Sequence, residues 1–328
     1  MPFVWKRILG TVPSLIGIVV ITFLLSRALP GDAAAHLAGS AASADAIAQI
    51  RAQLELDKSL IDQFFRYLVD LAHGDLGLSL TTGQPVLHDL ATRLPASLEL
   101  GACALLFGLG LAVPLGVLAA SPPEPWVDAL CRGSSAVGSA VPVFVGGLLL
   151  IYVFHALFGV LPRPSSAPAV MGSTVVDSLF AREWVAFRSS VGRLVLPSML
   201  LGLLALAPLA RTHHGAMQLA LGSDFIRTAR AGGLGARKIL YAYALRNALL
   251  PLTQGLGGVL GLLLGAGVLV EPVFGWPGVG AYAASAVLAS DHAAVQGFVL
   301  MTALLYVLLN LAIEIARVAL DPRVRFEG

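Results

Sequence analysis

The chain has 328 residues, of which 57% are hydrophobic and 12% are charged, and its formal net charge is only +2. Because soluble domains contain about 25% charged residues, this composition excludes an ordinary soluble protein. The small net charge gives no reason to expect a nucleic-acid partner.

Six charge-poor windows divide the chain, and each is close to or above the length of about 20 residues that a helix needs to cross a membrane. They are residues 8–29, 98–120, 134–160, 194–210, 248–270 and 293–316. The first follows Lys6 and Arg7 and is longer than the apolar core of a signal peptide, so we expect it to be retained as a span. The windows therefore predict an all-α integral membrane protein with six transmembrane helices.

The segment between the first two windows is the largest part of the chain predicted to lie outside the membrane. Within it, residues 59–71 place apolar side chains at helical spacing, namely Leu60, Ile61, Phe64, Phe65, Leu68 and Leu71. This pattern is typical of an amphipathic helix that rests on the bundle or on the membrane interface. We favour that interpretation over a substrate site.

Lysine and arginine are concentrated in the segment before the fifth window and in the C-terminal tail. The basic residues there are Arg227, Arg230, Arg237, Lys238, Arg246, Arg317, Arg323 and Arg325. Because cytoplasmic loops carry an excess of these residues, we expect both segments and the N-terminus to face the cytoplasm. An even number of spans then places both termini on that side.

The segment before the fifth window reads as a short cationic helix, a glycine break and a second cationic helix. Ser223 or Asp224 can cap the first helix, since their side chains accept hydrogen bonds from free backbone N–H groups. Gly232 and Gly233 can end it, because a left-handed residue after a helix costs glycine little. The second helix is predicted to start at Gly235.

Two explanations fit the charge of this segment. Basic helices beside a membrane often contact only anionic lipid headgroups. A compact helix–glycine–helix unit also fits a groove on a soluble partner, and Phe225 is a candidate anchor because aromatic and arginine residues dominate interface energies. The residues alone favour docking to a partner, but only modestly.

The remaining polar candidates have structural explanations. Glu271 is expected to order an outer gate or to cap the bundle rather than to bind substrate, and Phe274 and Trp276 are the other candidate gate residues. His213 and His214 are adjacent, so they do not share a helix face as a metal-binding pair would, and we expect them to be interfacial and no metal to bind.

Several motifs follow one another along the chain. They are LPGD at 29–32, GDLGLS at 74–79, RLP at 93–95, DFIRTARAGG at 224–233, ALRNALLP at 244–251, EPVFGWPGVG at 271–280, Asn310 and DPRVR at 321–325. In this order they resemble the ABC importer permeases of the dipeptide, oligopeptide and nickel class. Residues 224–233 resemble the EAA-type cytoplasmic loop of that family. The general Glu-Ala-Ala pattern is not literally present, because Arg227, Thr228 and Ala229 stand roughly in its place.

The resemblance implies a type I ABC importer permease fold in the cell inner membrane, importing peptides or a related small solute such as nickel complexes. Residues 1–97 would form an N-terminal transmembrane helix plus an extracytoplasmic helical segment. Residues 98–328 would form the transmembrane core, with a cytoplasmic coupling loop at 212–247. The ATPase-coupling residues implied by the resemblance are Asp224, Phe225, Arg227, Thr228, Ala229, Arg230 and Gly233.

The same resemblance implies a set of partners: a paralogous second permease, two ABC ATPase subunits and an extracytoplasmic solute-binding protein, besides membrane lipid. ATP and Mg²⁺ would be bound by the ATPase subunits, and the sequence G-x-x-x-x-G-K-[ST] does not occur in this chain. This chain is therefore expected to need no cofactor of its own and not to be an enzyme.

Two other functions fit a polytopic membrane protein. A secondary transporter driven by an ion gradient would need a membrane-embedded acid, for which Glu271 and Glu314 are the candidates. An intramembrane hydrolase would need an activated serine, and no G-x-S-x-G motif supports one.

Overall fold

The computed structural model describes residues 2–28, 58–120, 141–158 and 182–320, with a few single residues at 43–49 and 175–178. All regular secondary structure in this part of the chain is helical, and one isolated bridge joins Leu78 to Pro85. The long helices are α1 (Pro2–Ala28), α5 (Val86–Ala120), α7 (Val143–Phe158), α9 (Trp184–Gly222), α12 (Leu245–Phe274) and α14 (His292–Leu320). The short elements are α4 (Leu60–Ala72), α10 (Asp224–Ala231), α11 (Ala236–Lys238), the π-helical η1 (Ile239–Ala244) and α13 (Val279–Leu288).

Each predicted window overlaps one long helix, which confirms that the windows are helical. Four helices in the described residues are long and apolar enough to cross a membrane: Val86–Ala120, Trp184–Gly222, Ala236–Phe274 and His292–Val318. The described apolar stretches of α1 and α7, Gly10–Leu24 and Val143–Leu157, are shorter. The structure therefore supports four candidate spans directly.

The centre of the bundle is the packing of α5 against α9. At Gly202 a Cβ atom would overlap the Phe107 side chain and the Ala104 carbonyl, so the two backbones approach each other closely where α9 has no side chain. Around this point Leu201 and Leu209 are buried in the main hydrophobic core. Membrane helices associate largely through van der Waals packing, because the hydrophobic effect does not favour helix association within lipid. Small residues at the contact allow the close approach that this packing requires.

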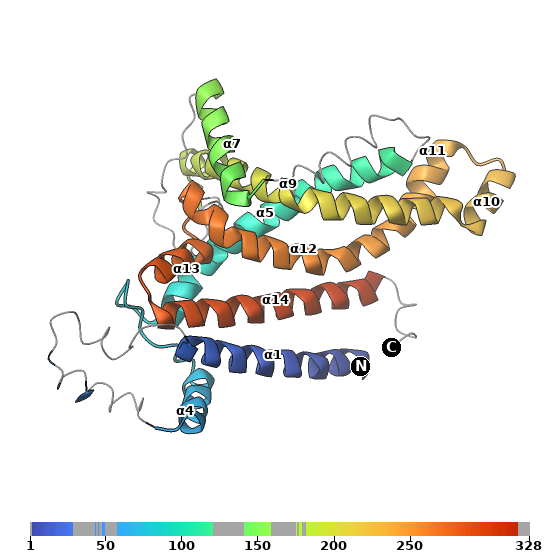
Figure 1. Cartoon of the computed structure of the whole chain (residues 1–328). Helices are drawn as coiled ribbons and strands as arrows, with labels where there is room; N and C mark the ends of the chain where they lie inside the picture. Colours follow the sequence, from blue (N-terminus) through green and yellow to red (C-terminus); the bar gives the residue numbers. More distant parts are fainter. Residues whose placement is uncertain are drawn as a thin grey trace.

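The other long helices are arranged around this pair (Figure 1). Helix α12 packs against α9, α14 packs against α12, and α1 packs against α14. Helix α10, the start of α1 and the end of α14 lie at one side of the bundle, and α13 lies at the other (Figure 1). We refer to these as the α10 end and the α13 end.

Candidate functional site

Helix α10 is attached to the bundle by one face and exposed on the other. Ile226 is completely buried, whereas Phe225 is 44% exposed. Asp224 and Arg227 form an ion pair at 3.4 Å, with both side chains largely in solvent. Exposed ion pairs contribute at most about 1 kcal/mol, so the attachment of α10 rests on Ile226 rather than on the charges. Phe225 and the basic side chains are thereby left available to a partner.

The start of α10 is at the predicted residue, but the predicted hydrogen bond is wrong. Ser223 is the N-cap residue, yet its side chain makes no capping bond to α10. Instead its hydroxyl donates to the Ala220 carbonyl at 2.5 Å, in the last turn of α9. A serine hydroxyl can bond to a carbonyl one turn back as well as to a free N–H ahead, and here it bonds to the carbonyl.

The predicted glycine stop is confirmed. Gly232 is the C-cap of α10, and Gly233 follows with φ +78, in the left-handed region. The Gly233 N–H donates to the Arg230 carbonyl at 3.0 Å, and the Leu234 N–H donates to the Ala229 carbonyl at 3.2 Å. These two bonds form a Schellman motif, which satisfies the last carbonyls of the helix and turns the chain sharply.

Beyond the glycine stop, the chain continues into the long helix α12 through a π-helical segment. Helix α11, η1 and α12 follow one another without a break, with Gly235 as the N-cap. Segment η1 buries Ile239 and Ala244 and leaves Tyr241 and Tyr243 exposed. It also contacts both α9 and α10. Sequence reasoning predicted the helix but not its π character, for which the residues carry no recognised pattern.

His213 lies inside the helix bundle. Its side chain is fully buried, and its ring packs where Gly116 of α5 has no side chain. The ring therefore fills a space between α5 and α9 near the α10 end.

At the α13 end, Glu271 connects three helices. The Ser97 hydroxyl of α5 donates to Glu271 Oε1 at 2.6 Å, and the Ala281 N–H of α13 donates to Glu271 Oε2 at 3.0 Å. The Ser97 Oγ also accepts the Val279 N–H at 2.8 Å. The first turn of a helix has no carbonyl partners for its N–H groups, so Ser97 and Glu271 cap α13 from neighbouring helices.

The other two predicted gate residues lie beside Glu271; Trp276 contacts α5, and Phe274 contacts α7. Trp276 is buried, and its indole N–H donates to the Ala96 carbonyl of α5 at 2.9 Å. The Phe274 ring packs against Gly147 of α7. Between them Gly275 ends α12 with φ +63. The structure thus brings Glu271, Phe274 and Trp276 together around one helix end that joins α5, α7 and α13.

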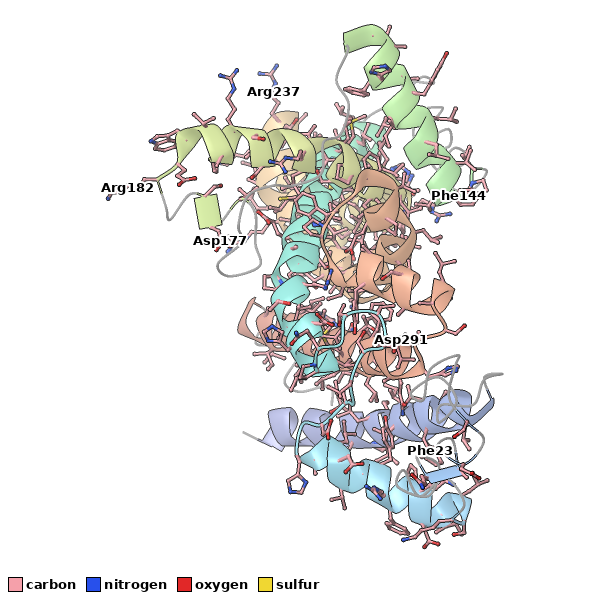
Figure 2. The ribbon with its side chains drawn as sticks, turned by 90° about the vertical axis from the view of Figure 1, so that its left-hand side faces the viewer. Phe23, Phe144, Asp177, Arg182, Arg237 and Asp291 are labelled. Carbon is pink, nitrogen blue, oxygen red and sulfur yellow. The ribbon has the colours of Figure 1, made fainter. Side chains whose placement is uncertain are left out.

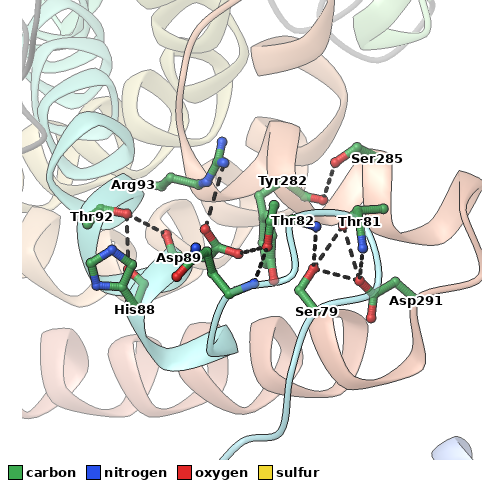
Figure 3. Close-up of polar contacts among 11 residues, drawn as sticks. Ser79, Thr81, Thr82, His88, Asp89, Thr92, Arg93, Tyr282, Ser285 and Asp291 are labelled. Carbon is green, nitrogen blue, oxygen red and sulfur yellow. Dashed lines mark hydrogen bonds and ion pairs between the residues drawn. The ribbon is translucent and has the colours of Figure 1, made fainter. Parts of the chain in front are cut away.

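A second polar cluster at this end was missed by the sequence reasoning (Figure 3). Asp291, between α13 and α14, accepts hydrogen bonds from the Ser79 hydroxyl at 2.7 Å and from the Thr81 N–H and hydroxyl at 3.1 Å each. Its other oxygen accepts the Ala294 N–H at 3.1 Å. Burial alone would raise the pKa of Asp291, but these donors hold it below its ordinary value. The turn at 79–82 is therefore tied to an ionised carboxylate.

The same turn is tied to α5. The Thr82 hydroxyl donates to Asp89 Oδ2 at 2.5 Å, and Arg93 lies 4.0 Å from the other Asp89 oxygen. The Arg93 guanidinium also sits 5.2 Å from the centre of the Tyr282 ring of α13, within cation–π range. Residues 79–93 thus connect α5, α13 and the start of α14.

An apolar cavity of about 210 Å³ lies beside Glu271. Its walls come from five helices, and representative lining residues are Ser97, Gly101, Leu201, Leu263, Glu271 and Phe298. Almost the whole lining is hydrocarbon, with the Ser97–Glu271 pair at one side.

Comparison with known proteins identifies relatives along the whole chain. Residues 1–101 match the N-terminal family of binding-protein-dependent transport system membrane components, and residues 112–326 match the family of binding-protein-dependent transport system inner membrane components. The probable D,D-dipeptide transport system permease protein DdpB of Escherichia coli (strain K12) is 41% identical, covering 97% of this chain and 96% of its own. The di/tripeptide transport system permease protein DppB of Pseudomonas aeruginosa (strain UCBPP-PA14) is 34% identical, with 100% and 99% covered. The glutathione transport system permease protein GsiC of Escherichia coli O6:H1 (strain CFT073) is 33% identical, with 99% of each chain covered.

Proposed function

This chain belongs to the family of inner membrane components of binding-protein-dependent transport systems, and on that basis we propose that it forms half of the translocation pore of a peptide importer. It is a multi-pass permease subunit of the cell inner membrane and not an enzyme. Relatives named for dipeptides, di/tripeptides and glutathione support small peptides, or a related small solute, as the substrate.

The proposed architecture has six transmembrane helices with both termini in the cytoplasm. Its support is that α1 and α7 coincide with apolar windows, and that the start of α1, the end of α14 and α10 lie at the same end of the bundle (Figure 1). The proposed division at residues 97 and 98 is supported by the separate family matches to 1–101 and 112–326. Helix α5 runs through this boundary, so the division concerns function rather than an independent fold.

We assign the coupling to the ATPase subunits to α10 and its glycine stop. The observation that carries this assignment is the two-sided character of α10, which is held by Ile226 and presents Phe225 outward. The residues proposed to contact or position the ATPase are Asp224, Phe225, Arg227, Thr228, Ala229, Arg230 and Gly233. Closure of the ATPases on ATP would push on this helix and, through η1, on α12. Alternating access of the pore follows from that movement.

At the opposite end, Glu271, Phe274 and Trp276 are proposed to close the outer side of the pore. Their support is the set of contacts by which the end of α12 holds α5, α7 and α13 together. A movement of α12 would break or remake these contacts. In this proposal Glu271 has a structural role, since both of its oxygens accept hydrogen bonds.

The proposed complex contains this chain, a paralogous second permease, two ATPase subunits and a solute-binding protein. Membership of a binding-protein-dependent system implies the ATPase and the binding protein. The paralogous permease and the number of ATPases are the further part of the proposal.

The test is a tagged pull-down from native membranes in mild detergent, followed by mass spectrometry. We expect a second permease and ATPase subunits to co-purify, and peptide uptake into proteoliposomes of that complex to require ATP. A chain that is isolated alone and that transports without ATP, but in response to an ion gradient, would overturn the proposal in favour of a secondary transporter. The matched control is the same tag on an unrelated inner membrane protein.

A further inference from the structure

Helix α4 presents an apolar stripe that no described helix covers. Ile61, Phe65 and Val69 are spaced four residues apart, so they lie on one side of the helix. Their exposed fractions are 68%, 62% and 55%. A stripe of three large apolar side chains this exposed to water is unusual for a soluble surface and indicates a binding face.

The orientation of this stripe is fixed by contacts on the neighbouring face of α4. The Phe64 ring meets the Phe23 ring of α1 edge-on with 5.2 Å between centroids, and the Tyr67 ring stacks on Phe23 at 5.7 Å. Phe23 is buried by this contact, and Figure 2 shows it between α1 and α4. Because aromatic pairs of this kind prefer defined geometries, α4 is held against α1 in one rotational setting.

The next face around the helix is polar. Asp62, Arg66 and Asp70 also lie four residues apart, adjacent to the apolar stripe. Two acids and one base give this face a net charge of −1. The helix start is capped by Ser59, whose hydroxyl oxygen accepts the Asp62 N–H at 3.3 Å, so the amphipathic segment has a defined beginning.

The position of α4 relative to the bundle points to lipid as the occupant of the stripe. In both Figure 1 and Figure 2, α1 lies between α4 and the rest of the bundle, so α4 is at the periphery. The side chains of α1 that face outward are themselves apolar, including the exposed Ile21 and Leu24. Phe23 of α1 contacts Phe64 of α4, so the exposed apolar side chains of α1 and the apolar stripe of α4 belong to two helices that touch at this point.

We propose that α4 is an interfacial helix whose Ile61, Phe65 and Val69 side chains insert between the lipid acyl chains of the leaflet at the α13 end. The polar stripe then lies at the headgroups, as in other helices that rest in the plane of a membrane interface. Because that stripe has a net charge of −1, which anionic headgroups do not attract, insertion depends on apolar burial and not on attraction to anionic headgroups. The Phe23 contact transmits this anchoring to α1.

The test places a nitroxide spin label at each face of α4. The variants Phe65→Cys and Arg66→Cys, with Cys103→Ala and Cys131→Ala in both, are labelled and reconstituted into phosphatidylcholine nanodiscs. Power saturation then compares collisions with oxygen, which enters lipid, and with a polar nickel chelate, which stays in water. We expect about tenfold fewer nickel collisions at position 65 than at position 66, because a polar solute is excluded from hydrocarbon. Val69→Cys and Asp70→Cys provide an independent pair should the first misfold.

Three results would overturn the proposal. Equal nickel collisions at 65 and 66 would place the stripe in water. Shielding of position 65 from both reagents would mean that protein covers it, and shielding that arises only when a solute-binding protein is added would identify a protein docking site. If the spin label at position 65 lies deeper in the membrane when phosphatidylglycerol is included, and less deep again at high salt, then attraction between charges and not apolar burial drives the insertion. An unchanged depth supports the proposal.

Discussion

The turn at residues 79–82 is held by two carboxylates, Asp291 and Asp89, and removing the charge of Asp291 should loosen the turn. In Asp291→Asn the amide oxygen can still accept the Ala294 N–H, but an NH₂ group replaces the oxygen that accepts three bonds from Ser79 and Thr81. The two hydroxyls are already 2.9 Å apart and can pair with each other, so the Thr81 N–H bears the main loss. Breaking hydrogen bonds to a buried charge costs about 2–4 kcal/mol in total.

That loss corresponds to opening of the turn about 30-fold to 700-fold more often. Hydrogen–deuterium exchange of the purified protein, followed by mass spectrometry of peptides covering residues 77–85, measures it directly. Peptides from α10 should be unaffected. The matched control is Asp224→Asn, because the Asp224 side chain is 96% exposed at the other end of the bundle. If residues 77–85 exchange at the same rate in Asp291→Asn as in the wild type, Asp291 does not hold the turn.

Other expectations follow from the same contacts. The pKa of Asp291 is lowered in the folded protein, so its ionised form stabilises the fold fully above the unfolded pKa of about 3.9, and this stabilisation is lost only as pH falls through the lower folded pKa. Protection of the turn from hydrogen exchange, corrected for intrinsic exchange, should therefore not change between about pH 8 and 5. A loss of protection in that range would contradict the assignment. Gly233→Trp should leave the protein inserted while abolishing ATP-coupled uptake, because the left-handed backbone there strains any side chain; full uptake would remove Gly233 from the coupling site. Phe225→Ala should weaken ATPase binding by about 2 kcal/mol, or about 30-fold, in a detergent titration, with unchanged thermal stability showing that the fold is intact. A methyl group at Gly278 would overlap the Ser97 and Glu271 side chains, so Gly278→Ala should destabilise the fold by about 1–3 kcal/mol and lower the Tm. The control is Gly258→Ala, which should leave the Tm unchanged or raise it, because a Cβ at Gly258 meets nothing within 4 Å.

The features predicted correctly from the sequence are those with local causes. The windows of apolar residues mark helices because hydrocarbon requires a helix to satisfy its own backbone, whatever lies nearby. The end of α10 was predictable because a left-handed residue after a helix favours glycine at that position, and Gly233 is there. Ser223 shows the limit of such reasoning, since its hydroxyl donates to the Ala220 carbonyl of α9 and does not accept an N–H of α10.

The features that were missed depend on contacts between distant segments. Ser79 and Asp291 are 212 residues apart, and nothing in either local sequence indicates that they meet. The burial of His213 depends on the missing side chain of Gly116, which lies on another helix. Helix α13 was not predicted, because its capping groups, Ser97 and Glu271, come from other helices.

From Ala236 to Phe274 the backbone forms one helical rod of 39 residues, which at 1.5 Å per residue is about 58 Å long. Its first residue follows the glycine stop of α10, and its last turn carries Glu271. The rod deviates from regular α-helix in the wide turn of η1, and prolines stand at 251 and 272. The glycine stop of α10 and Glu271 therefore lie near the two ends of one continuous helix.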